Sequence, residues 1–282
     1  MKNILIATDF SNDAYCALFY ITKLMTSRPC SFFILNVFDE LTPLEGKKDT
    51  LFGGKKLLDR LELQSKDKLT QTVHRIVLDN KEPQHHFQTL SEKGHLSKTI
   101  IKTIDTFQID LLVMGSKGKT GAKEIFLGSN TIQAANAMTK CPVLAVPKQI
   151  DYKTPKAIAF VTDFKKGCEK KTINPLLLLA SLTMASIHVM HINEEEILDK
   201  EQESNKKLLE LCLEDVDHSF HWMQNFADKA QVIDIFLEKL AIDMFAMVHR
   251  KRGFIQKLIR EPVIKDVSLY SNIPFLILSS QD

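Results

Sequence analysis

The strongest constraint on the fold is that the chain carries the same pattern twice. An apolar run at residues 4–7 ends in Thr-Asp-Phe at positions 8–10, and a second apolar run at 157–161 ends in Thr-Asp-Phe at 162–164. Each is followed by a polar turn and a helical pattern. The order and spacing of these segments predict a tandem duplication.

The two halves also end alike, each on a short apolar run that contains a proline near its start. These runs cover residues 142–146 and 273–278. A chain of 282 residues fits two domains of roughly 150 residues each. We therefore predict one domain over 1–148 and a second over 154–282, joined by a polar linker between Pro147 and Pro155.

Short, continuously apolar strands alternate with helical patterns in both halves, which predicts an α/β fold with a parallel sheet covered on both faces. The first half is expected to form strands at 2–8, 31–38, 86–91, 110–114 and 142–146, and helices at 12–27, 55–80, 95–107 and 128–138. The second half is expected to form strands at 156–162, 186–191, 217–222, 242–248 and 273–278, and helices at 169–184, 195–213, 226–240 and 260–270.

Composition narrows the class of protein. A net charge of +2, from 37 basic and 35 acidic residues, gives no reason to expect nucleic acid or a membrane surface as a partner. The start of the chain enters a strand pattern directly, and no apolar run reaches the roughly 20 residues of a membrane span. The five cysteines are scattered and form no CxxC, so we expect a reduced, cytoplasmic protein without a disulfide framework.

A spaced glycine set separates the strand at 110–114 from the helix at 128–138. Gly115 and Gly118 are followed, after nine residues, by Gly128 and Ser129. Glycines let the backbone approach a ligand closely, and the N–H groups at a helix N-terminus favour an anion. The set therefore predicts a phosphate-binding loop.

Other candidate ligand contacts lie at neighbouring strand ends. Ligands of open α/β sheets bind outside the carboxyl ends of the strands, near the switch in strand order. Asp9 follows the first strand, Val37 lies near the end of the second, and Met114 ends the fourth. We expect them to line one crevice with the glycine set, where Asp9 accepts from a ribose hydroxyl or an amino group. The backbone amides expected to bind phosphate are those of Gly115, Gly118, Ser129 and Asn130.

The glycine set, with Met114 before it and Cys-Pro-Val-Leu at 141–144 after it, resembles the nucleotide-binding signature of the universal stress proteins. Residues 4–11 also resemble the first strand of that family. The resemblance covers the first half by motif and the second by topology. It implies two tandem Rossmann-like αβα sandwiches of the adenine nucleotide alpha hydrolase type, each with a five-stranded parallel sheet.

The same resemblance implies a ligand and an assembly. The ligand is ATP, AMP or ADP, and magnesium or manganese accompanies ATP in such proteins. Asp9 would contact the nucleoside, and the backbone at Val37 would contact adenine. The glycines and Ser129 would hold ribose and phosphates. The two domains would pair through their final strands as an intramolecular pseudo-dimer, and a homodimer is left open.

The second half departs from the glycine pattern. Residues 249–254 read His-Arg-Lys-Arg-Gly-Phe, and Arg-Glu-Pro at 260–262 stands roughly where the first half has Gly128 and Ser129. Bulky side chains would occupy the phosphate's space, and proline lacks an N–H. We therefore expect this half to have lost nucleotide binding, although the basic run at 249–252 leaves another anion open.

The predicted function is nucleotide-dependent regulation or stress response through a single N-terminal site. Two alternatives remain: slow ATP hydrolysis or phosphate transfer at the same loop, and a nucleotide-free interaction scaffold. No catalytic residue is predicted, because no general base is evident beyond Asp9, which could instead be a turn residue. No metal ligands are predicted either. The histidine pairs 188/191 and 218/221 are spaced i, i+3 in strands, and so face opposite sides.

Overall fold

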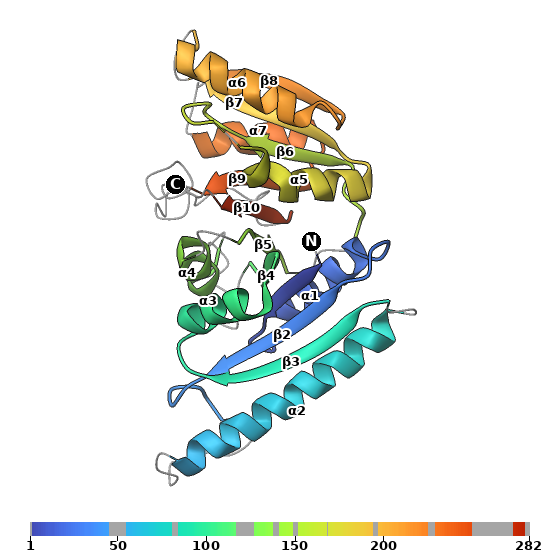
Figure 1. Cartoon of the computed structure of the whole chain (residues 1–282), viewed down its shortest axis with the longest axis vertical. Helices are drawn as coiled ribbons and strands as arrows, with labels where there is room; N and C mark the ends of the chain where they lie inside the picture. The colour runs from blue at the N-terminus through green and yellow to red at the C-terminus, as the bar shows by residue number, and fades with distance from the viewer. Residues whose placement is uncertain are drawn as a thin grey trace.

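A ten-stranded β-sheet runs through the part of the chain that the computed structural model describes (Figure 1). The strand order is β3-β2-β1-β4-β5-β10-β9-β6-β7-β8. The described residues are 2–44, 55–80, 84–116, 127–137, 141–148, 152–167, 169–193, 197–224, 229–249 and 273–279.

The first half supplies five mutually parallel strands. They are β1 (Asn3–Ala7), β2 (Ser31–Phe38), β3 (His86–Lys93), β4 (Leu111–Gly115) and β5 (Val143–Val146). The helices are α1 (Asn12–Leu24), α2 (Lys55–Asp79), α3 (Leu96–Phe107) and α4 (Ser129–Ala137).

The second half supplies another five parallel strands. They are β6 (Ala157–Val161), β7 (Ser186–Asn193), β8 (His218–Gln224), β9 (Met244–His249) and β10 (Phe275–Ser279), and the helices are α5 (Lys170–Thr183), α6 (Lys200–Leu213) and α7 (Lys229–Lys239). The predicted helix at 260–270 lies outside the described residues. The α/β class and the two Rossmann-like, five-stranded parallel sections are confirmed.

The two sections join through their final strands. β10 lies beside β5 and runs antiparallel to it, with Leu276 opposite Leu144. Both leucines are fully buried, and the Ser279 hydroxyl donates to the carbonyl of Cys141 at 2.6 Å. Pairing of the final strands is the contact expected from the sequence. The domain boundaries at 148 and 154 stay a prediction.

Helices cover both faces of the sheet, and a hydrophobic cluster lies beneath each layer. Side chains from alternate strand positions enter opposite clusters. One cluster packs under α1, α2, α5 and α6, and the other under α3, α4 and α7. Each cluster contains residues of both β5 and β10, so the hydrophobic core continues from one half into the other.

Membrane-spanning helices and cysteines are the other two subjects of prediction, and the described residues bear on both. None of their helices combines the length and apolar character needed to cross a lipid bilayer. Cysteines 16, 30, 141 and 212 are all free thiols, and burial raises the pKa of Cys141 to about 12. Cys141 is a core residue because its side chain is buried, and this burial keeps its thiol protonated at neutral pH.

Candidate functional site

The strand order of the first half reverses between β1 and β4, and this switch point brings several predicted residues together. Asp9 follows β1 directly, and Met114 and Gly115 end β4, its parallel neighbour. Val37 lies near the end of β2, which pairs with β1 on its other side. All four therefore lie at the same edge of the sheet, where open α/β folds bind ligands.

The start of α4 is held against the end of β4. The N–H of Gly128 donates to the carbonyl of Ser116 at 2.6 Å, and the hydroxyl of Thr131 donates to the carbonyl of Gly115 at 2.9 Å. The first N–H groups of an α-helix have no partner within the helix. Ser129 and Asn130, which begin α4, are exposed at this edge. The arrangement can present helix N–H groups to an anion. Gly118 lies outside the described residues.

Gly115 is required by helix packing. A Cβ added to it would lie 2.9 Å from the carbonyl carbon of Asp13 and 3.1 Å from the backbone nitrogen of Ala14. Its missing side chain therefore lets β4 approach the first turn of α1. The sequence prediction assigned that close approach to a ligand, whereas the structure shows a second reason for glycine here.

Asp9 has a structural role in the turn after β1. Its Oδ1 accepts from the N–H of Ser11 at 3.0 Å, and Phe10 adopts a left-handed backbone with φ of 62°. The same turn recurs in the second half, where Asp163 Oδ1 accepts from Lys165 N–H at 3.0 Å. The repeated Thr-Asp-Phe pattern is thus explained by backbone geometry, and ligand contact by Asp9 stays a prediction.

Val37 and Met114 lie on one face of the sheet. Met114 is buried in the cluster under α3 and α4, and Val37 is half-buried and packs against the same cluster. The side chains of Val37 and Met114 therefore share the α3/α4 face, the side on which α4 begins.

A largely buried network of side-chain hydrogen bonds, which the sequence analysis does not predict, holds this edge of the sheet together. Asn36 Nδ2 donates to the carbonyl of Thr8 at 2.8 Å, and Asn36 Oδ1 accepts from the Ser65 hydroxyl at 2.9 Å. Ser91 then donates to Ser65 at 2.8 Å. This hydrogen-bond network ties β1, β2, β3 and α2 together. Its sequence signal is Asn36, the one polar residue among the apolar residues 32–38 of β2, because a buried amide needs partners.

Two histidines meet across strands in the second half. His188 Nδ1 lies 3.2 Å from His221 Nε2, and the Ser219 hydroxyl lies within 3.1 Å of both nitrogens. The spacing of histidines within one strand gives no sign of this pair, which the β7–β8 register creates. Among the described residues, no group of three or more His, Cys, Asp or Glu side chains could hold a metal ion.

This pair predicts a pH dependence of stability. Burial lowers the pKa of His188, assisted by the charge of His221, and burial also lowers the pKa of His221. Below the unfolded-state pKa near 6.5 the unfolded chain therefore binds more protons than the folded chain. We expect the free energy of unfolding to fall as the pH drops from about 7 to about 5, measured by urea denaturation.

The matched variants separate this effect from general acid sensitivity. The double variant His188→Gln/His221→Gln should show a smaller fall in the free energy of unfolding between pH 7 and pH 5. Part of the fall remains, because burial also lowers the pKa of His85 and His249. His74→Gln, at an exposed position of α2, should leave the slope unchanged. Equal slopes for the double variant and the parent would contradict the assignment.

Comparisons with known proteins agree with this fold. A model of the universal stress protein family matches residues 1–147. Over 159 residues the chain is 31% identical to a universal stress protein of Methanocaldococcus jannaschii, covering 52% of this chain and 96% of the relative.

Solved structures extend the similarity to both halves. A universal stress protein from Archaeoglobus fulgidus superposes with a TM-score of 0.72 at 18% identity, covering 99% of this chain and 97% of the other. A putative universal stress protein from Pseudomonas aeruginosa superposes with a TM-score of 0.63 at 14% identity, covering 100% and 94%. At these identities the likeness shows a shared fold.

Proposed function

Because this chain belongs to the universal stress protein family, we propose that it binds an adenine nucleotide at the β1–β4 edge and acts in regulation or stress response through that site. The observation that carries the proposal is the anchoring of α4. Gly128 and Thr131 bind the backbone at the end of β4, so the start of the helix lies beside the switch point. Phosphate groups bind readily at such helix starts.

The proposed contacts divide the ligand into two parts. Asp9 would accept hydrogen bonds from the nucleoside, and Val37 and Met114 would contact the base on the α3/α4 face. The phosphates would meet the backbone N–H groups of Gly115, Gly118, Ser129 and Asn130, while Gly128, whose N–H is bonded to Ser116, would leave space for them. The exposed start of α4 supports this division, since charged phosphates remain accessible to water there.

We propose that a magnesium or manganese ion would accompany the nucleotide. Magnesium is commonly held by one or two carboxylates together with substrate phosphates and water. The nearby carboxylate of Asp13 lies 4.0 Å from the Lys148 ammonium, and Asp9 holds the turn after β1. Because both carboxylates already have partners within the chain, the nucleotide's phosphates and water would supply most of the metal's ligands.

We also propose that the nucleotide site is single and that the second half serves as a packing partner in a pseudo-dimer. The antiparallel β5–β10 contact supports such a partnership. The free thiols of the described cysteines support a reducing compartment, the cytoplasm.

Calorimetric titration of the full chain with ATP tests both claims. We expect the purified protein to release a bound adenine nucleotide when it is denatured, and we expect the chain freed of that nucleotide to bind one ATP. Gly128→Trp should weaken binding by about 100-fold, because an indole would occupy the space beside the helix start that the phosphates need. The control is Lys102→Trp on the exposed surface of α3, which should bind as the parent does.

The outcomes separate the alternatives. Two nucleotides per chain would contradict a single site, and unchanged binding in Gly128→Trp would contradict its location. Turnover of ATP that disappears in Gly128→Trp would favour an enzyme. A protein with neither co-purified nucleotide nor a thermal shift in ATP would favour the nucleotide-free scaffold.

A further inference from the structure

A hollow lies on the other face of the first-half sheet, between α1 and α2. Its volume is about 230 Å³. Its floor is apolar and includes Ile6, Leu18 and Ile34, all buried in the cluster under α1 and α2. Val37 and Met114 belong to the cluster on the opposite face. The sheet therefore separates this hollow from the base-binding side of the candidate nucleotide site.

The rim of the hollow is polar and carries positive charge. Lys68 and Arg75 contribute to it from α2, seven residues apart and so about two turns along one side of the helix. Ser11, Tyr15 and Thr72 add hydroxyl groups. None of the described lining residues is acidic. Cations and hydroxyls above an apolar floor suit an anion with an apolar body.

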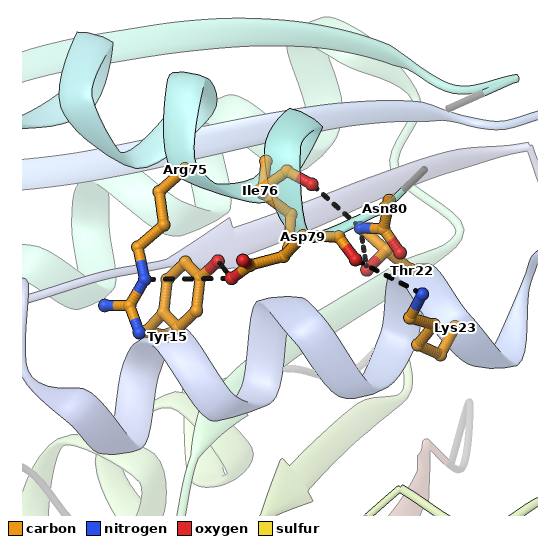
Figure 2. Close-up of polar contacts among 7 residues, drawn as sticks. All are labelled: Tyr15, Thr22, Lys23, Arg75, Ile76, Asp79 and Asn80. Carbon is orange, nitrogen blue, oxygen red and sulfur yellow. Dashed lines mark hydrogen bonds and ion pairs between the residues drawn. The ribbon is translucent and has the colours of Figure 1, made fainter. Parts of the chain in front are cut away.

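Arg75 is held in place beside the hollow. Its guanidinium carbon lies 3.6 Å from the centre of the Tyr15 ring, and its Nε lies 3.8 Å from Asp79 Oδ2. The Tyr15 hydroxyl donates to the same carboxylate (Figure 2). Burial and Asp79 raise the pKa of Tyr15, so the hydroxyl stays a donor. A stacked, paired guanidinium loses less freedom on binding an anion than a mobile one does.

The end of α2 is also fixed to α1. Asn80 Nδ2 donates to the Thr22 hydroxyl at 3.1 Å and to the carbonyl of Ile76 at 3.0 Å (Figure 2). The Lys23 ammonium donates to the carbonyl of Asp79 at 3.4 Å. The two helices are thus joined at this end, while the hollow lies between them at the other, near Phe10.

The second half closes the corresponding place. Asn205 Nδ2 donates to the carbonyl of Phe164 at 2.8 Å, and Gln202 Nε2 donates to the carbonyl of Asp163 at 3.0 Å, so α6 is tied to the turn. Phe164 is 2% exposed, whereas its counterpart Phe10 is half-buried and lies beside Lys68, whose Nζ is 5.4 Å from the ring centre.

Phe164 also has aromatic neighbours that Phe10 lacks at the matching strand positions. Phe164 stacks on His191 at 4.9 Å between ring centres and lies 6.1 Å from Trp222. Counted by strand register, the positions of His191, Phe220 and Trp222 are occupied in the first half by Asn36, Thr89 and Ser91. The hollow thus occurs in the half that lacks this aromatic cluster.

We propose that this hollow binds a small organic anion, with a carboxylate or phosphate at Lys68 and Arg75 and a compact apolar body over Ile6 and Leu18. The volume is below the roughly 300–1,000 Å³ typical of drug-sized ligands, so the ligand is correspondingly small. The hollow lies on the other face of the sheet from Val37 and Met114, and its rim reaches Thr8 and Phe10 on either side of Asp9.

Nuclear magnetic resonance titration with phenyl phosphate, benzoate and uncharged benzyl alcohol tests this proposal on the full chain. We expect saturable shifts of the backbone amides of Ser11, Tyr15 and Thr72 with either anion and none with the alcohol. Lys68→Met and Arg75→Met should each weaken binding of phenyl phosphate about tenfold, since each removes one charge-assisted contact.

Two control variants test whether the anion binds at the hollow itself. Lys66 is an exposed lysine that pairs with Glu62 on α2. The Lys66→Met variant should bind phenyl phosphate as the parent does. Gly128→Trp should also retain these amide shifts, and Lys68→Met should retain ATP binding. The proposal is overturned if the amides do not shift up to about 10 mM anion, if Lys68→Met and Lys66→Met behave alike, or if benzyl alcohol binds equally well.

Discussion

Replacing Leu276 by aspartate should abolish the folded state of both halves. Leu276 is fully buried and lies opposite Leu144 where β10 meets β5. Removing a buried leucine costs about 2–5 kcal/mol, and an unpaired carboxylate in the same place adds several kcal/mol. The sum is comparable with the total stability of a typical domain, about 5–15 kcal/mol.

Circular dichroism and Trp222 fluorescence during urea denaturation measure this loss. Trp222 lies on β8, at the far end of the sheet from β5, so it reports on the second half away from the substitution. Leu211→Asp on α6 is the control, because Leu211 is 62% exposed and should change stability by about 0.5 kcal/mol or less. If Leu276→Asp kept ATP binding and a cooperative transition, the halves would not share a core.

Gly115→Val should lower the free energy of unfolding by about 3 kcal/mol, the upper part of the range for overpacked sites. The added Cβ would meet the backbone of Asp13 at 2.9 Å and of Ala14 at 3.1 Å. Backbone atoms in the first turn of α1 cannot rotate away as the end of a side chain can, so the helix must shift from β4.

Urea denaturation with and without ATP separates this packing effect from ligand binding. Ser129→Val is the matched control, because Ser129 begins α4 at an exposed position and its replacement should leave stability within about 0.5 kcal/mol. An unchanged denaturation midpoint for Gly115→Val in the absence of ATP would show that β4 and α1 do not require a glycine here.

The fold was predictable because its signals are local. The continuously apolar strands and the repeated Thr-Asp-Phe turn are visible in the sequence, and turn geometry depends only on near neighbours: Asp9 accepts from Ser11, and Asp163 accepts from Lys165. The edge on which Asp9, Val37 and Met114 gather also followed from strand order in parallel sheets.

The remaining features depend on contacts between distant segments. The His188–His221 pair exists because β8 adopts one register against β7, and the order of residues within each strand does not show that register. The packing of Gly115 on Asp13 depends on how closely β4 approaches α1. The hollow beside Arg75 depends on the spacing of two helices, for which the alternation of apolar and polar residues carries no signal.

The antiparallel contact between β5 and β10 has a consequence for how the two copies can diverge. All strands of the first half run parallel to β5 and all those of the second half to β10. The carboxyl ends of the strands, where each half has its switch point, therefore lie at opposite edges of the sheet. A strand of five residues separates these edges by roughly 17 Å. No small ligand can bridge the two edges. One copy can thus lose its loop glycines, or acquire a new ligand, without disturbing what the other copy binds, provided that the shared core is kept.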